Sequence, residues 1–143
     1  MTSDPAKAKH VLIVEDEPDF AALLWSILTK GGYTASTAHN WEEALKELEN
    51  KTPDLITLDV NIPEKSGMFF YRDIKANQRF RDVPVIVVTG LTRDDEDMEH
   101  VVRSLMELDH VPPPKAYVEK PVDGPSLLRT VQEALSSSES ENR

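Results

Sequence analysis

The stretch VLIVEDEP at residues 11–18 decides the fold, because four large aliphatic residues pass directly into three acids and a proline. An uninterrupted apolar run of this length is typical of a strand covered on both faces, as in a parallel sheet. Pro18 suits the first turn of a helix, where its missing N–H would have no intrahelical partner in any case. The stretch therefore predicts a strand followed at once by a helix, with acids at the junction.

The same alternation of short β-branched runs with stretches of helical period continues along the chain and predicts five strand–helix units around a parallel sheet. The run at residues 33–37 is the most polar, so we place it at a sheet edge. The helical period predicts inward-facing side chains on the first two helices, including Leu23 and Leu45. Strands are predicted at residues 11–14, 33–37, 55–58, 85–88 and 116–118, and helices begin at Pro18, after Asn40, at Met68, after Thr92 and near Asp123.

Length and charge narrow the classes of protein. The 143 residues suit one compact domain, and 16 Lys and Arg against 26 Asp and Glu give a net charge of −10, which would repel nucleic-acid phosphates. Without cysteine, the chain has no disulfide framework and no thiolate metal site, as expected in a reducing compartment. No apolar run reaches the ~18 residues of a membrane span, and the first ten residues are too polar for a secretory signal. We therefore expect a cytoplasmic protein that binds neither nucleic acid nor membrane directly.

Composition also predicts the limits of the domain. Residues 1–8 are expected to be a flexible N-terminus, residues 9–136 the folded domain, and residues 137–143 a disordered tail rich in Ser and acids. Within the domain, three consecutive prolines at 112–114 remove three N–H donors and predict an extended connection into the last strand.

Acids stand directly after two of the predicted strands, at Glu15, Asp16 and Glu17 after the first and at Asp59 after the third. In an open parallel sheet the carboxyl ends of the strands share one edge, where diverging loops leave a crevice. Carboxylates gathered there repel one another unless protons or a cation offset their charge. All-oxygen ligands select Mg²⁺, Mn²⁺ or Ca²⁺ over zinc, so the pattern predicts a site for a hard divalent cation.

A hydroxyl and an ammonium complete this set, because Thr89 follows the fourth predicted strand and Lys120 the fifth. Both groups can hold the oxygens of a phosphoryl group. Taken singly, each residue has a simpler interpretation: Glu15 and Asp16 as acids favoured at a helix N-terminus, and Asp59 as a turn residue. Their joint occurrence at strand ends favours a functional site.

Four short motifs stand at these strand ends in chain order: VEDEP at 14–18, LDVNIPEKSG at 58–67, VTG at 88–90 and YVEKP at 117–121. Together they resemble the receiver domains of two-component response regulators. With the strand–helix pattern between the motifs, the resemblance covers residues 9–136. It implies an α/β fold of the flavodoxin-like, CheY-like type: a doubly wound, five-stranded parallel (βα)5 sheet with strand order 2-1-3-4-5.

The resemblance also implies the role of each site residue. Asp59 would be the phosphorylated residue and would take its phosphoryl group from a histidine kinase or a histidine phosphotransfer protein. Mg²⁺ would be held by Glu15, Asp16 and Asp59 and by the backbone carbonyl of Asn61. Lys120 would pair with the phosphoryl oxygens. The domain would then be a signalling module that catalyses only its own phosphotransfer and dephosphorylation, not an enzyme acting on other substrates.

A conformational switch is implied by the same resemblance. Thr89 would move toward the phosphoryl group, and Tyr117 would turn inward into the vacated space. This changes the face formed by the fourth helix, the fifth strand and the fifth helix, where a downstream protein effector would dock. The chain would be a monomer or a phosphorylation-dependent homodimer. The bond between Lys120 and Pro121 is expected to be cis.

Two alternative functions remain. An aspartyl-phosphate phosphatase or phosphotransferase of the haloacid dehalogenase type usually has a second acid two residues after its nucleophile, but that position is Asn61 here. A receiver-like adaptor that is never phosphorylated would not need Asp16, Asp59, Thr89 and Lys120 together. The sequence departs from the commonest receiver pattern at Glu15, where aspartate is frequent. Because of its extra methylene group, Glu15 would bind the metal directly or through water.

Overall fold

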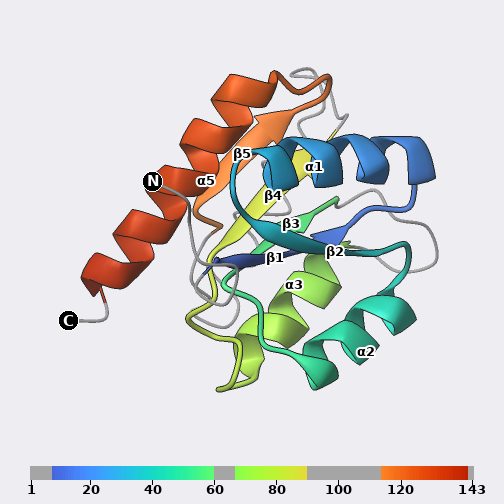
Figure 1. The fold of residues 1–143 in the computed structure, drawn as a ribbon. Coiled ribbons are helices and arrows are strands. Elements are labelled where there is room, and N and C mark those ends of the chain that lie inside the picture. Colours follow the sequence, from blue (N-terminus) through green and yellow to red (C-terminus); the bar gives the residue numbers. More distant parts are fainter. Residues whose placement is uncertain (1–7, 60–66, 90–113, 142–143) are drawn as a thin grey trace.

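The structure is a computed structural model that describes residues 8–59, 67–89 and 114–141. Its centre is a five-stranded sheet of order β2-β1-β3-β4-β5, in which every pairing is parallel (Figure 1). The predicted fold class and the edge position of the second strand are therefore confirmed. The strands are β1 His10–Val14, β2 Thr34–Ala38, β3 Leu55–Leu58, β4 Val85–Thr89 and β5 Ala116–Glu119.

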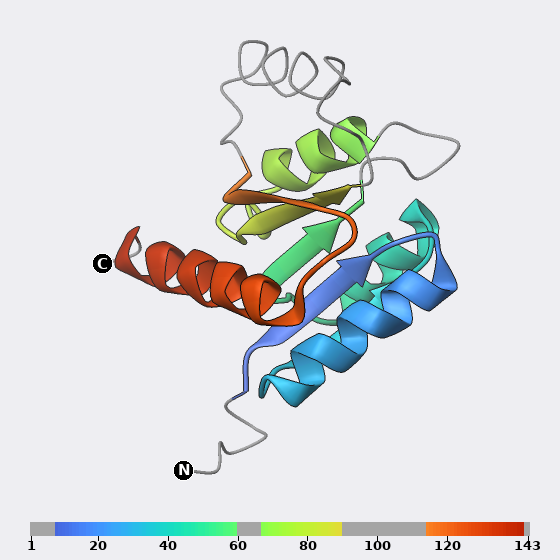
Figure 2. The same cartoon turned by 90° about the horizontal axis from the view of Figure 1, so that it is seen from above.

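Helices cover both faces of the sheet. Helices α1 and α5 lie on one face and α2 and α3 on the other, which gives three layers (Figures 1 and 2). The helix predicted after Thr92 falls outside the described residues. In the part of the chain that the structure describes, no helix is both long enough and apolar enough to cross a membrane. The helices are α1 Pro18–Lys30, α2 Trp41–Asn50, α3 Gly67–Ala76 and α5 Gly124–Glu141.

Strand β1 separates two hydrophobic clusters, one on each face. Leu12 and Val14 belong to the cluster under α2 and α3, whereas Val11 and Ile13 belong to the cluster under α1 and α5. All four side chains are at most 2% exposed. Because successive side chains of a strand point to opposite faces, a strand covered on both faces needs apolar residues at every position. This explains the uninterrupted run that decides the fold.

Local signals in the sequence fix the helix ends. Pro18 occupies the first turn of α1, as predicted. Asn40 caps α2, where its Oδ1 accepts a hydrogen bond from the backbone N–H of Glu43 at 2.8 Å. The Glu43 carboxylate accepts from the backbone N–H of His39 at 2.9 Å, one residue earlier than a capping box requires. Asp123 caps α5 by accepting from the Ser126 N–H at 3.1 Å.

Two predictions about the helix faces are wrong. Leu23 on α1 is 46% exposed and Leu45 on α2 is 51% exposed, although both were expected to face the core. Each is the sequence neighbour of a buried residue: Leu23 directly precedes Leu24, and Leu45 directly follows Ala44. Adjacent residues of a helix are rotated by about 100° about its axis, so the neighbour of a buried residue points to the side of the buried face and not into the core. On both helices the buried face is narrower than the apolar residues of the sequence predicted.

The C-terminal helix is longer than predicted. Helix α5 continues to Glu141, whereas residues 137–143 were expected to form a disordered tail. After Pro125 the sequence holds no glycine or proline that would end a helix. Serine and glutamate are compatible with an exposed helix, so their abundance does not by itself stop one.

Lys75 on α3 is a buried cation away from the acids at the sheet edge, and its side chain is 6% exposed. Its ammonium donates to the backbone carbonyls of Arg81, at 3.0 Å, and of Val83. It thereby ties the end of α3 to the segment that enters β4. Burial lowers the pKa of Lys75 to about 8; the charge of Asp82 opposes this shift and that of Lys115 adds to it.

We expect the buried ammonium of Lys75 to make stability depend on pH. Its pKa in the folded protein, about 8, lies below the ordinary 10.5, so the unfolded chain binds more protons between these values and stability rises with pH. The unfavourable contribution is full below about pH 8 and is relieved as the pH approaches 10.5. Lys75→Met removes the dependence. Urea unfolding of both proteins from about pH 7.5 to 9.5 measures it, and a difference between them that does not change with pH would contradict it.

Candidate functional site

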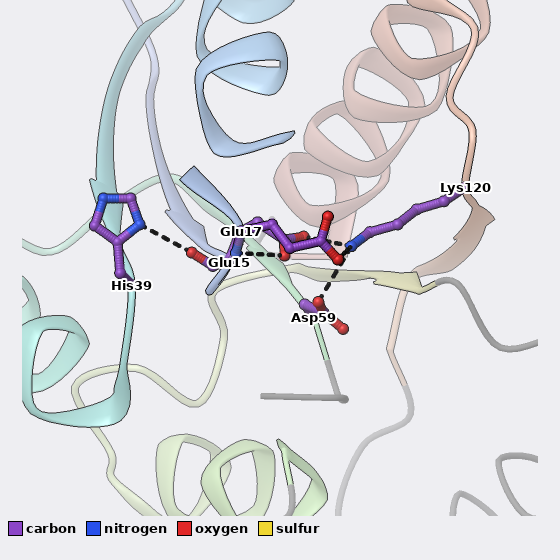
Figure 3. Close-up of polar contacts among 5 residues, drawn as sticks. All are labelled: Glu15, Glu17, His39, Asp59 and Lys120. Atoms are coloured by element: carbon purple, nitrogen blue, oxygen red, sulfur yellow. Dashed lines mark hydrogen bonds and ion pairs between the residues drawn. The ribbon is translucent and has the colours of Figure 1, made fainter. Parts of the chain in front are cut away.

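Glu15, Glu17, Asp59 and Lys120, which belong to the set predicted at the carboxyl edge of the sheet, lie together there (Figure 3). Glu15 directly follows β1, Asp59 directly follows β3 and Lys120 directly follows β5. The ladder of the sheet continues past the strand ends and holds the two acids: the Glu15 N–H donates to the Ala38 carbonyl at 2.9 Å, and the Asp59 N–H donates to the Val14 carbonyl at 3.0 Å. The backbone of the central strands therefore sets the positions of both carboxylates.

The Lys120 ammonium is the hub of the site. Its Nζ lies 2.9 Å from Oε1 of Glu15 and 3.2 Å from Oδ2 of Asp59, and 3.7 Å from Oε1 of Glu17. Glu15 and Asp59 are 1% and 3% exposed, whereas the Glu17 side chain is 66% exposed. The face of the Phe20 ring lies against the same ammonium, with its centroid 4.3 Å from Nζ. The positive charge of Lys120 thus offsets part of the negative charge of two buried carboxyl groups that both contact it.

The proximity of these groups changes their proton affinities. Burial and, next, the hydrogen bond with Asp59 raise the pKa of Glu15 to about 8, although Lys120 acts in the opposite direction. Burial alone would lower the pKa of Lys120, but the hydrogen bond to Glu15 and the charges of Asp59 and Glu15 outweigh it and raise that pKa. Glu15 therefore binds its proton more tightly than an ordinary glutamate, and it does so next to a lysine that stays charged.

Short contacts fix the turn that carries the acids. The Glu17 N–H donates to Oε2 of Glu15 at 3.2 Å. His39, which follows β2, places its Nδ1 3.1 Å from the backbone carbonyl oxygen of Glu15 (Figure 3). The start of α1 is closed by the Ala21 N–H, which donates to the Glu17 carbonyl at 2.9 Å. The acidic turn is thus held from the neighbouring strand end and from the helix that follows.

Three carboxylates of this turn could hold a metal ion. Oxygen atoms of Glu15, Asp16 and Glu17 lie within 4.8 Å of one another. A set of carboxylate oxygens suits a hard divalent cation such as Mg²⁺. The residues present therefore fit the predicted metal. Glu17 was predicted among the acids at this edge, but it is not one of the metal ligands that the resemblance implies.

The other predicted site residues stand as follows. Thr89 ends β4 and pairs in register with Glu119 of β5, but its side chain lies outside the described part of the structure, as does all of Asn61. Tyr117 lies on β5 with its side chain 47% exposed. The bond between Lys120 and Pro121 is cis, as the resemblance implied.

Two contacts at the site were not predicted. The Phe20 ring packs against the core cluster under α1 and α5 and also covers the Lys120 ammonium. His39 contacts the backbone carbonyl oxygen of Glu15. Phe20 stands three residues after Glu17, but its contact leaves no local pattern in the sequence because its partner, Lys120, is 100 residues away along the chain.

A parallel sheet of order β2-β1-β3-β4-β5 with acids and a lysine at its carboxyl edge defines the CheY-like class of α/β proteins. A sequence model of the response regulator receiver domain matches residues 11–132, and the chain belongs to this family. Receiver domains are signalling modules of two-component response regulators. The recognition made from the four motifs is thus confirmed.

Individual relatives agree with this assignment. The polar-differentiation response regulator DivK of Brucella anthropi is 30% identical over 127 residues, which are 89% of this chain and 96% of DivK. The phosphate regulon transcriptional regulatory protein PhoB of Escherichia coli is 30% identical over 89 residues, 62% of this chain but only 39% of PhoB. A CheY-like receiver domain protein from Methanospirillum hungatei shares the fold, with a TM-score of 0.79, 24% identity and coverage of 94% of this chain and 99% of that one.

We expect Lys120→Met to destabilise the protein by about 3–5 kcal/mol at neutral pH, because removing one partner of a buried ion pair leaves charge without compensation. Urea unfolding measures the loss. Lys46→Met is the matched control, since the Lys46 ammonium pairs with Glu42 at 3.8 Å on the exposed face of α2 and should contribute less than about 1 kcal/mol.

A second substitution tests the cause of that loss. Glu15→Gln removes one of the two buried carboxyl groups, so it should cost less stability in the Lys120→Met background than in the parent protein. If the two substitutions are additive, the ammonium and the Glu15 carboxylate are energetically independent and the ion pair at 2.9 Å has no role in stability.

Proposed function

We propose that the chain is a receiver that is phosphorylated on Asp59 by a histidine kinase or a histidine phosphotransfer protein in a Mg²⁺-dependent reaction. The observation that carries this proposal is the Lys120 ammonium, which lies between the buried carboxyl groups of Glu15 and Asp59 at 2.9 and 3.2 Å. Burying two acids beside one cation is costly for a structural role alone. The membership in the receiver family and the acidic cluster at the same edge support it.

The chemistry of the step follows from the groups present. A carboxylate oxygen of Asp59 attacks the phosphorus of the phosphohistidine, the P–N bond breaks, and its electron pair stays on the imidazole nitrogen. The product is an acyl phosphate on Asp59. Lys120 offsets the charge that develops on the phosphoryl oxygens, since its ammonium already lies within 3.2 Å of the accepting carboxylate.

Glu15 and Asp16, with the carbonyl of Asn61, would hold Mg²⁺, and Glu17 completes the acidic cluster in the structure. When bound, Mg²⁺ supplies positive charge to oxygens of the transferring group. The acids of the turn would hold the cation near Asp59, and the contacts of His39 and of the Ala38 carbonyl keep that turn in place. The contacts that hold the acidic turn are thus in place without a phosphoryl group.

The output of the proposed receiver runs through protein contacts. Thr89, at the end of β4, and Tyr117, half exposed on β5, are the proposed switch pair. Inward rotation of Tyr117 would change the face that β5 and α5 present to a downstream protein effector. The chain would act as a monomer or as a homodimer that forms on phosphorylation. The receiver itself is proposed to span residues 9–136.

We expect incubation with acetyl phosphate and Mg²⁺ to add one phosphoryl group to the chain, and Asp59→Asn to abolish that gain. Intact-mass spectrometry measures the uptake directly. The amide cannot act as the nucleophile, and it replaces the carboxylate with little change of shape, so the variant should keep its fold by circular dichroism.

The controls separate the acceptor from the metal. A chelator should prevent uptake by the parent protein, and Asp54→Asn, at a carboxylate that accepts from the His10 N–H at the opposite edge of the sheet, should leave uptake unchanged. Persistent uptake by a folded Asp59→Asn protein would assign the acceptor to another residue.

Binding of the metal can be tested without phosphorylation. We expect Asp16→Asn to weaken Mg²⁺ binding by at least tenfold in isothermal titration calorimetry, because loss of even an outer-shell partner typically costs about 10-fold or more in metal affinity. Glu42→Gln, on the exposed face of α2, is the control for the general loss of one negative charge. Equal affinities of these two variants would place the metal elsewhere.

A further inference from the structure

The Lys120 ammonium has a neighbour that is not an acid. The Phe20 ring centroid lies 4.3 Å from Nζ, within the range of a cation–π interaction. Phe20 is the third residue of α1, and its side chain packs partly buried against the core cluster under α1 and α5. The ring is therefore held by the core on one side and faces the ammonium on another.

We propose that Phe20 is a positioning residue for Lys120: its aromatic face holds the ammonium at the edge of the sheet, beside the acceptor carboxylate. The proposal rests on the proposed function, in which Lys120 contacts the phosphoryl oxygens.

Charge explains why a ring serves better than another acid. Lys120 already faces Glu15, Asp59 and the more distant Glu17. A further carboxylate would add to the repulsion among these acids, whereas an aromatic face attracts a cation without carrying net charge. The ring also leaves the N–H groups of the ammonium to oxygen atoms, because it is only a weak hydrogen-bond acceptor.

Geometry explains why such a contact is needed. An ammonium has three N–H donors; that of Lys120 donates to Oδ2 of Asp59 at 3.2 Å, and Oε1 of Glu15 lies 2.9 Å from Nζ as its ion-pair partner. Glu17 at 3.7 Å is beyond hydrogen-bond distance, and its side chain is 66% exposed. The third direction is thus weakly fixed by acids, and the Phe20 ring limits how far the end of the lysine chain can swing.

The first turn of α1 makes the ring a rigid support. Pro18 starts the helix, and the Ala21 N–H closes its first turn on the Glu17 carbonyl at 2.9 Å. Phe20 lies within this turn, directly after the acids of the metal cluster. The segment from Glu15 to Phe20 therefore carries both the carboxylates and the ring. Both contact the ammonium of Lys120, which is distant in the sequence.

The test must separate the electrostatics of the ring from its volume. Mono-, di- and trifluorinated phenylalanine at position 20 keep the shape of the ring while weakening its negative face step by step. We expect the rate of phosphorylation by acetyl phosphate to fall at each step, by about fivefold overall, which corresponds to about 1 kcal/mol at 1.36 kcal/mol per tenfold change. The same analogues at Phe70, which stacks on Trp41 at 4.5 Å under the other face of the sheet, should leave the rate unchanged.

A second measurement does not depend on phosphorylation. Exchange of the Lys120 ammonium protons with water, followed by ¹⁵N NMR at low temperature, should become faster along the same series as the contact weakens. Lys120→Arg identifies the signal by its disappearance. A purely packing role for Phe20 predicts no trend in either measurement, because the ring keeps its shape.

The outcomes are distinguishable. Falling rates with faster exchange support the proposal, and a flat rate with flat exchange overturns it. If the parent protein accepts no phosphoryl group, the proposed function fails, and the exchange series alone decides whether Phe20 holds the ammonium. Phe20→Leu adds a last check: its rate should match or fall below that of the trifluorinated protein, and a rate equal to the parent's would overturn the role of the ring.

Discussion

The site depends on one constraint: two carboxyl groups that are almost completely buried lie side by side and need a cation. Glu15 and Asp59 are 1% and 3% exposed, and the Lys120 ammonium contacts both. Two ionised acids in such surroundings repel each other strongly and lose their hydration, and the positive charge of a lysine beside them offsets part of this cost. The raised pKa of Glu15, about 8, is the consequence of burial and of this neighbour. Strands β1, β3 and β5 end where they bring these three side chains together.

The sheet supplies the positions. Because β1 pairs directly with β3, the residues after these strands are neighbours, and their backbone N–H groups are held by adjacent strands. Strand β4 separates β3 from β5, so the group that arrives from β5 must have a long side chain. Lysine has that reach, and its apolar stem tolerates partial burial while its charged end meets the acids. The packed clusters on both faces keep these distances from relaxing.

Most of the fold could be predicted because its signals are local. The apolar runs that become β1, β3 and β4, the proline at the start of α1 and the Asn40 cap each act within a few residues. The meeting of Glu15, Asp59 and Lys120 could also be predicted, since parallel strands end at one edge. Sequence did not predict that Leu23 and Leu45 are exposed, because their exposure depends on how much of each helix face the sheet covers. It did not predict the length of α5 either, because no residue in the sequence marks where that helix ends. The contacts of Phe20 and of Lys75 join groups whose pairing leaves no periodic trace in the sequence.

The choice of glutamate at position 15 adds a step to this argument. Its longer side chain brings Oε1 within 2.9 Å of the Lys120 ammonium, closer than the 3.2 Å from Oδ2 of Asp59. Under the proposed function, a phosphoryl group on Asp59 adds about −1.5 to −2 charges and competes with Glu15 for the same N–H donors. The ammonium can turn toward the new oxygens only if Glu15 finds another partner, and a cation held by the acidic turn is such a partner. Under that proposal, metal binding and release of Lys120 from Glu15 would be one coupled event, and the Phe20 ring, whose centroid lies 4.3 Å from Nζ, would stay in contact with the ammonium.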